Sequence, residues 1–317
     1  MLFLLGNVVF ASSFTLLIKW VQARQREDVI TIGAINYITA ALCILPEYLG
    51  ERVTEHHANA VVAGAIMGAC YFIAYFFVIH AIRWIGAAAS TVISVLSIVV
   101  PITCGIYIWN EQPNEQQYAG VLAALVALVL IGGRRRKPAS AIDQTDRPAN
   151  RSLQSNQQRQ LHEEDARAPA SGVQNVRAAP WFTPLILLSF FLLAGTNRLT
   201  QEAFRHTAPA EQRPVFLMTA FAVASLPSLL ILIVRRRISR TELLFGISMG
   251  LANILQSHFI LKSLKSFDGF IVFPVVSAGS LMLTTFVTTQ VFHEQLTRRR
   301  RLGIGIAVAA LVLLNWH

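Results

Sequence analysis

Long blocks of apolar residues, separated by short polar stretches, dominate the sequence. Each block is roughly 20 residues long, the length of an α-helix that crosses the ~30 Å hydrocarbon core of a bilayer. Ten blocks are expected to be transmembrane helices: residues 2–20, 29–49, 59–82, 86–109, 117–133, 181–203, 214–234, 242–264, 268–292 and 301–316. The pattern therefore predicts an all-α, multi-pass integral membrane protein with ten transmembrane helices.

The stretch between the fifth and sixth blocks, residues 134–180, differs in composition. It contains no aromatic residue and four prolines, and it carries 14 of the 44 charged residues of the chain. Such a segment buries too little apolar surface to offset the entropy lost when a chain becomes ordered. We therefore predict a disordered linker between two units of five spans, residues 1–133 and 181–317.

Short motifs recur in both units at an offset of 182–183 residues. Gly64-Ala-Ile-Met-Gly68 in the third span corresponds to Gly246-Ile-Ser-Met-Gly250 in the eighth. Two further pairs follow in the same order, Glu111 with Glu294 and Gly120 with Gly303. Because each unit has an odd number of spans, the second unit is expected to be inverted relative to the first. Inverted repeats are typical of transporters, whose substrate site lies between the repeats near the middle of the membrane.

The ends of the two units resemble the EamA type of the drug/metabolite transporter superfamily. The likeness rests on Trp109-Asn-Glu111 followed by Gly120, and on Phe292-His-Glu294 followed by Gly303. The resemblance implies that residues 1–133 and 181–317 are EamA-like repeats. It also implies that they form a ten-helix bundle with spans 1, 3, 4, 6, 8 and 9 around a central cavity. Such a bundle moves small metabolites or drugs by alternating access.

The small multidrug resistance proteins, single-unit members of the same superfamily, are similar at Phe273–Glu294 and at Thr15–Trp20. Their membrane-embedded glutamate, which binds both the proton and the cationic drug, would fall at Ala11 in the first unit and at Ala194 in the second. This departure argues against proton-coupled export of cationic drugs by their mechanism.

Composition and charge exclude several other classes of protein. Only 14% of residues are charged, 54% are hydrophobic and the mean hydropathy is +0.51, whereas soluble domains carry about 25% charged residues. A soluble enzyme and a nucleic-acid-binding domain are therefore excluded despite the net charge of +10.

The distribution of Lys and Arg predicts the orientation. Loops after odd-numbered spans hold 20 of them and loops after even-numbered spans hold four. Because cytoplasmic loops are enriched in Lys and Arg, the linker is expected in the cytoplasm and both termini outside. We expect a bacterial inner membrane.

Polar side chains inside the predicted spans are the candidates for binding a solute. One face of the third span carries Tyr71 and Tyr75 after its two glycines, and the matching face of the eighth carries Asn253 and Ser257. Glycines at this spacing favour close helix packing. Tyrosine rings suit stacking on organic solutes, and buried hydroxyls need a hydrogen-bond partner. These four residues line a substrate site or serve in packing alone.

Four further positions complete the candidate site. Arg198 in the sixth span would cost roughly 2.5–3.5 kcal/mol at the centre of a bilayer. It either forms a neutral pair with Glu202 one turn on, or recognises an anionic group of the substrate with Asn197 beside it. Ser94 and Ser277 lie on hydroxyl-rich faces of the fourth and ninth spans, where bonding back to their own helix is the alternative.

The sequence contains no GxxxxGK[ST], HExxH or GxSxG motif, each of which marks a specific chemistry. We therefore predict no enzyme, no catalytic residue, no cofactor and no metal. The expected function is a secondary transporter that exports small polar or amphipathic metabolites. A nucleotide-sugar or phosphorylated-metabolite exchanger and a transport-inactive membrane scaffold or sensor stay as alternatives. The expected partners are a small-molecule substrate and the lipid bilayer, not nucleic acid, and the oligomeric state is left open.

Overall fold

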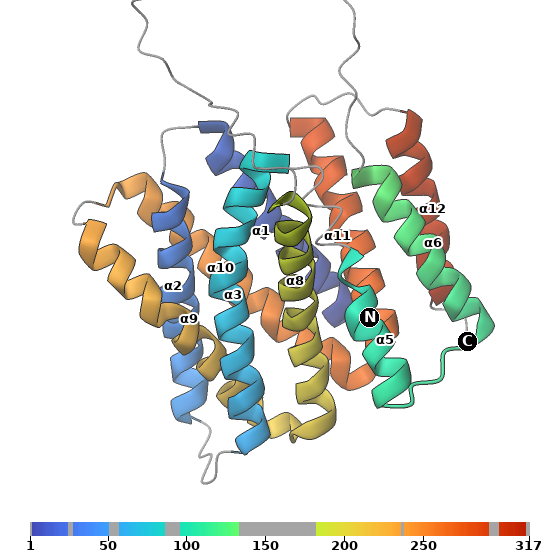
Figure 1. The fold of residues 1–317 in the computed structure, drawn as a ribbon, viewed down its shortest axis with the longest axis horizontal. Helices are drawn as coiled ribbons and strands as arrows, with labels where there is room; N and C mark the ends of the chain where they lie inside the picture. Colours follow the sequence, from blue (N-terminus) through green and yellow to red (C-terminus); the bar gives the residue numbers. More distant parts are fainter. Residues whose placement is uncertain are drawn as a thin grey trace, which may run out of the picture.

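The computed structural model describes residues 2–24, 28–50, 57–85, 96–132, 182–235, 238–291 and 298–314, and these are helical apart from short connections. The first unit contributes α1 (Leu2–Arg24), α2 (Val29–Gly50), α3 (Ala58–Ile85), α5 (Val99–Ile108) and α6 (Glu115–Gly132). The second contributes α8 (Phe182–Thr207), η1 (Ala210–Gln212), α9 (Arg213–Arg235), α10 (Arg240–Ser266), α11 (Gly269–Val291) and α12 (Arg298–Leu314). The ten described α-helices form one bundle (Figure 1).

The helix bounds follow the predicted spans closely, with one difference. The predicted span 86–109 is represented by α5 alone, because residues 86–95 lie outside the described part of the chain. The predicted linker, 134–180, also lies outside it. Among the described helices, α2, α3, α9, α10 and α11 contain segments long and apolar enough to cross a membrane by length and composition. The remaining five membrane crossings stay predictions.

Apolar side chains cover the outside of the bundle. On α9, for example, Leu226, Leu230 and Ile233 are each at least 65% exposed, and their spacing places them on one helical face. A large apolar surface of this kind marks a region that is covered by another molecule or by lipid. The fold thus has the surface expected of a multi-pass membrane protein.

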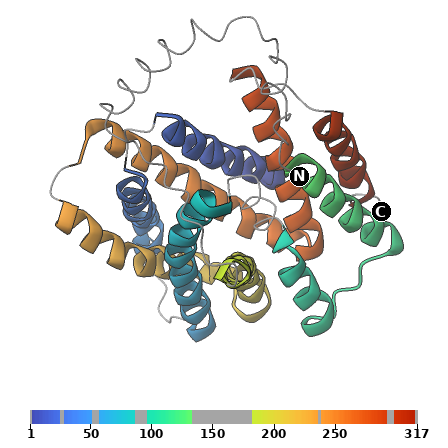
Figure 2. The same cartoon turned by 45° about the horizontal axis from the view of Figure 1, so that its top comes forward.

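The helices of the two units interleave (Figures 1 and 2). Helix α2 packs against α9, and α6 packs against α12. Six further contacts occur as three equivalent pairs: α2–α10 with α9–α3, α1–α10 with α8–α3, and α1–α11 with α8–α5. Exchanging each helix for its counterpart in the other unit therefore reproduces these contacts.

Glycines make the first of these equivalent contacts close. A Cβ atom added at Gly64 of α3 would lie 2.5 Å from the carbonyl oxygen of Phe216 on α9. One added at Gly68 would lie 2.2 Å from the carbonyl oxygen of Ala220. Since real Cβ atoms keep a larger distance, α3 and α9 approach this closely only because both positions are glycine.

The second unit repeats this arrangement with α10 and α2. A Cβ atom at Gly246 would lie 2.5 Å from the side chain of Ile35, and one at Gly250 would lie 2.7 Å from the carbonyl oxygen of Asn36. The interpretation of the four glycines as packing residues is confirmed.

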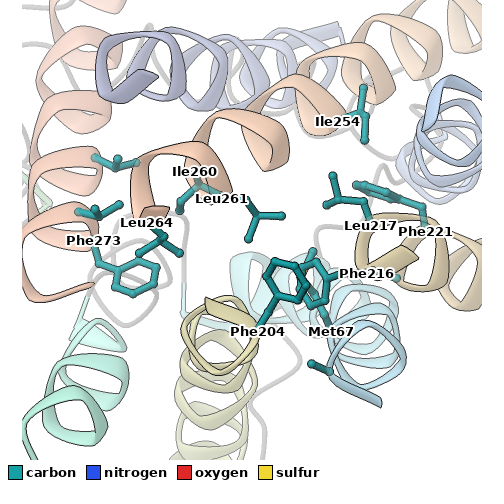
Figure 3. Packing of buried hydrophobic residues seen from close by; sticks show 14 of the residues in the cluster. Met67, Phe204, Phe216, Leu217, Phe221, Ile254, Ile260, Leu261, Leu264 and Phe273 are labelled. Atoms are coloured by element: carbon teal, nitrogen blue, oxygen red, sulfur yellow. The ribbon is translucent and has the colours of Figure 1, made fainter. Parts of the chain in front are cut away.

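The main apolar core lies between α2, α3, α8, α9, α10 and α11, so residues of both units fill it (Figure 3). Phe204 of α8 stacks on Phe216 of α9 with ring centroids 4.6 Å apart, and Met67 of α3 lies beside them. Ile260, Leu261 and Leu264 of α10 extend the core toward α11. This shared core fixes the helices that carry the polar residues described next.

Candidate functional site

Buried polar side chains from α2, α3 and α10 meet inside the bundle. The hydroxyl groups of Tyr71 and Ser257 are hydrogen-bonded at 3.4 Å, and the Tyr37 hydroxyl donates to the main-chain carbonyl of Tyr71 at 2.9 Å. The Asn253 amide donates to the side-chain oxygen of Asn36 at 3.3 Å. We call the group Asn36, Tyr37, Tyr71, Arg198, Gln201, Asn253 and Ser257 the polar layer.

Aromatic rings line one side of the polar layer. The rings of Tyr37 and Tyr71 stack with centroids 6.1 Å apart, and Tyr71 stacks in turn on Phe221 of α9 at 5.9 Å. Tyr75 meets the edge of Tyr37 at 6.1 Å. Its hydroxyl donates to the main-chain carbonyl of Val29, so Tyr75 points toward the beginning of α2 rather than into the layer.

Helix α8 supplies the remaining members of the layer. Arg198 donates a hydrogen bond to the Ser97 hydroxyl and lies close enough to Tyr71 to interact with it electrostatically. The Gln201 amide donates to the sulfur of Met67 at 3.9 Å. Arginine, glutamine and tyrosine therefore present a cation, an amide and a hydroxyl from two neighbouring helices.

The predicted pairing of Arg198 with Glu202 is wrong. The Glu202 carboxylate accepts from Arg205 at 2.8 Å and lies 3.2 Å from the imidazole of His206. Its ion-pair partner is Arg205, three residues further along α8. The i,i+4 spacing indicated Arg198 as the partner of Glu202, whereas the ion pair forms with Arg205 at i,i+3.

Two buried amides of the layer have hydrogen-bonding capacity left over. Within the described part of the chain, the Asn36 amide nitrogen and the Gln201 carbonyl oxygen have no hydrogen-bond partner. A buried polar group without a partner costs about 1–3 kcal/mol. The layer therefore offers one donor and one acceptor that a bound solute would satisfy.

The structure brings together four of the eight predicted site residues: Tyr71, Arg198, Asn253 and Ser257. Tyr75 adjoins this group through Tyr37. Ser94 lies outside the described residues.

Two predicted residues make local main-chain contacts within the described part of the chain. The carbonyls of Asn197 and Ser277 accept hydrogen bonds from Thr200 and Ser280 on their own helices. Sequence reasoning missed Asn36 and Tyr37, although two adjacent polar residues in the apolar block 29–49 could have indicated them.

A second group of charged side chains lies where α8 ends. Arg205 donates to Glu111 and to Glu202 at 2.8 Å each, and it also binds Asp268. His206 lies 3.6 Å from Glu111, and its ring stacks on Trp109 at 4.7 Å. We call Glu111, Glu202, Arg205, His206 and Asp268 the Glu202 cluster. It joins α8 to the turn before α6 and to the turn before α11.

The Glu202 cluster marks one end of the bundle, at which α2, α5, α8 and α10 finish (bottom of Figure 1); we call it the Asp268 end. Glu47 binds Arg213 at 2.8 Å and His258 at 2.9 Å where α2 approaches this end. At the opposite, Asp28 end, Asp28 binds Arg235 at 2.7 Å. Ion pairs thus connect helices of both units at each end.

A metal ion does not suit the Glu202 cluster. Among the described residues, Glu111, Glu202 and His206 are the group whose oxygen and nitrogen atoms lie within 4.8 Å of one another. Arg205 already donates to the same carboxylate oxygens, so its guanidinium occupies the position of a cation and would repel an ion. The described residues offer no evident cofactor site.

With ten described helices, an apolar exterior and a layer of polar side chains inside the bundle, the fold agrees with that of a membrane transporter. Residues 1–133 match the EamA-like transporter family. For residues 1–133 this match confirms the resemblance drawn from the sequence, which is to the drug/metabolite transporter superfamily. Members of the family are membrane transporters and not enzymes.

Two full-length comparisons extend the likeness beyond the EamA-like unit. The chain is 22% identical to an uncharacterized protein of Haemophilus influenzae over 304 residues, which cover 93% of this chain and 91% of that protein. It also superposes on a protein of known crystal structure with a TM-score of 0.67 and 15% identity, covering 99% of this chain and 95% of the other. The second comparison supports the fold of the whole chain.

Proposed function

We propose that the protein is a secondary transporter that exports small polar or amphipathic organic solutes through the polar layer. The observation that carries the proposal is the unused hydrogen-bonding capacity of Asn36 and Gln201 beside the stacked rings of Tyr37 and Tyr71. Aromatic faces bind the apolar part of a solute, while the amides bind its polar part. Such a mixture of apolar walls and few directed polar groups is typical of small-molecule sites.

The proposed mechanism is alternating access between two inverted repeats of five spans each. The equivalent contacts of α3 with α9 and of α10 with α2 support this symmetry, because the same glycine motif makes both. In an inverted repeat, the two sets of contacts are related by rotation about an axis in the membrane plane. The polar layer draws on α2 and α3 from one unit and α8 and α10 from the other.

The proposed setting is a bacterial inner membrane with the 134–180 linker in the cytoplasm. The excess of Lys and Arg in the loops after odd-numbered spans supports this orientation. The Asp268 end, which holds the Glu202 cluster, then faces the outside.

Exchange of anionic solutes, such as phosphorylated metabolites, is the second candidate. Arg198 favours it because a guanidinium binds phosphate and carboxylate groups with paired hydrogen bonds. Arg198 lies in the same layer as Tyr71.

Untargeted profiling of metabolites in cells and medium tests both candidates. The wild type is compared with Tyr71→Ala and with Tyr107→Ala, a matched control because Tyr107 is 81% exposed on α5. We expect one class of solute to accumulate outside cells with the wild type and the control. Export in the Tyr71 variant should fall on the order of tenfold, since the loss of one contact worth ~1.4 kcal/mol has that effect.

The identity of the exported solute separates the candidates. An anionic solute whose export also requires Arg198 would favour exchange of phosphorylated metabolites. Equal export by all three proteins would contradict the site, and no change in any solute would contradict transport. Export that survives removal of residues 140–175 would exclude the scaffold alternative.

A further inference from the structure

The carboxyl groups of Glu111 and Glu202 form a buried pair at the Asp268 end. Their side chains are 5% and 0% exposed, and one oxygen of each carboxyl group lies within 4.8 Å of an oxygen of the other. Each has one oxygen, Oε2, without a hydrogen-bond partner among the described residues. Two carboxylates that are both ionised repel each other at this distance, and the pair therefore needs a positive charge between them.

The surrounding charged groups supply only part of the positive charge that the two carboxylates need. Arg205 and His206 face the pair from α8, Glu111 comes from the turn between α5 and α6, and Asp268 comes from the turn between α10 and α11. Arg205 is thus the one permanent cation of the cluster and faces three carboxyl groups. Burial lowers the pKa of His206, and Arg205 lowers it further, so the imidazole is neutral at neutral pH.

The space around the free oxygens admits only a very small cation. A Cβ atom at Gly105 would lie 2.5 Å from Oε2 of Glu111, and one at Gly269 would lie 2.4 Å from Oε2 of Glu202. Main chain therefore packs against both free oxygens, and Arg205 covers the Oε1 atoms. A proton fits here, because it is held on a carboxyl oxygen itself and needs no further space.

We propose that Glu111 and Glu202 together bind one exchangeable proton, and that this proton is the coupling ion of the transport cycle. The second part rests on the proposed function. The site differs from the embedded glutamate of the small multidrug resistance proteins, whose positions here are Ala11 and Ala194.

Helix α8 connects the proton to the solute. It carries Arg198 and Gln201 in the polar layer and Glu202, the next residue, in the cluster. While the bundle is open to the cytoplasm, the proton leaves the carboxyl oxygen for water on the cytoplasmic side, its O–H bond breaks and both carboxylates carry a charge. Their repulsion pushes α8 away from the turn before α6, which loosens the Asp268 end. Binding of a proton from outside reverses this step, so protons enter while solute leaves.

Infrared spectroscopy on the purified protein in lipid tests proton binding without any solute. The probe is pH alone, and the readout is the carbonyl band of protonated carboxyl groups. In the wild type we expect a protonated-carboxyl band that persists to neutral pH. It should be lost at that pH in Glu202→Gln and in Glu111→Gln, because Arg205 then neutralises the single remaining carboxylate.

Glu211→Gln is the matched control, since Glu211 is exposed on η1 at the same end of the bundle. This variant should keep the band. Two independent variants keep the test decisive if one of them fails to fold. A wild-type protein without the band at neutral pH, or a band unchanged in both cluster variants, would overturn the proposal.

Coupling is tested in liposomes that contain the protein and are loaded with the small-molecule extract of the producing cells. We expect an inward-directed proton gradient to accelerate the release of one solute class by the wild type and the Glu211 control. Glu202→Gln should lose this dependence on the gradient. If the rate of solute release by the wild type does not depend on the proton gradient, proton coupling is overturned and the transport proposal stays intact. No release by any protein, with the infrared result as expected, would overturn transport and coupling but not proton binding.

Discussion

At the scale of single residues, the absence of a side chain decides how the two units meet. Gly68 lets α3 approach the main chain of α9, and Gly250 does the same for α10 and α2. In a membrane, helices gain no hydrophobic free energy by leaving lipid, so association depends on such close packing. A methyl group at either position has to push two helices apart.

We therefore expect Gly68→Ala to destabilise the protein by about 1–3 kcal/mol, the usual cost of overpacking. The new Cβ would lie 2.2 Å from the Ala220 carbonyl oxygen, which belongs to main chain and has little freedom to move. Gly305→Ala on α12 is the control, because nothing lies within 4 Å of its Cβ position. Unfolding in mixed micelles measures both variants. Equal stability of the two would contradict the close contact.

The same scale shows what sequence could and could not predict about the site. Tyr71, Asn253 and Ser257 were predicted because the two units repeat, so a polar face in one span indicated its counterpart. Asn36 and Tyr37 lie on α2, where no motif recurs, and only their neighbours in space show that they belong to the layer. The partner of Glu202 was missed because the direction of a side chain determines which nearby cation it contacts, and spacing along the sequence does not give that direction.

At the scale of elements, Arg205 connects three segments that are distant in sequence. It binds Glu202 on its own helix, Glu111 before α6 and Asp268 before α11. Because Glu111 and Glu202 are buried, removing this arginine leaves charge without compensation, which costs more than the loss of a surface pair.

Arg205→Gln is accordingly expected to lower the free energy of unfolding on the order of 3 kcal/mol. Arg235→Gln, which breaks the half-exposed pair with Asp28, should cost less than about 1 kcal/mol. The loss in the Arg205 variant should shrink as the pH falls, since protonation removes the uncompensated carboxylate charge. Unfolding measured at several pH values checks both statements. A pH-independent loss would contradict the electrostatic explanation.

The elements themselves were predicted more fully than their packing. Helix bounds follow from apolar blocks of membrane-spanning length, and α2 and α9 differ from the predicted spans only at their ends. Which helices touch depends on complementary surfaces, such as the glycines of α3 against α9, and hydropathy carries no information on this. Only the recurrence of the glycine motif indicated that these contacts come in pairs.

At the scale of the whole molecule, the two units share one core and are tied at both ends. Phe204 of α8 and Met67 of α3 belong to different units and pack together in the centre. The ion pairs at the Asp268 end and the Asp28 end also cross between units. The proposed movement between inward- and outward-open states would therefore break contacts at one end while it keeps the core, and the orientation decides which end would open outside.

Cysteine labelling in cells determines that orientation. In a variant with Cys43, Cys70 and Cys104 replaced, Glu211→Cys marks the Asp268 end and Ile238→Cys marks the Asp28 end, because both positions are exposed. The excess of positive charge near Ile238 predicts that this end is cytoplasmic. A membrane-impermeant maleimide should then label position 211 in intact cells and position 238 only after permeabilisation. The reverse pattern would place the Glu202 cluster on the cytoplasmic side, and the proton would have to enter the cycle from the solute-loading side.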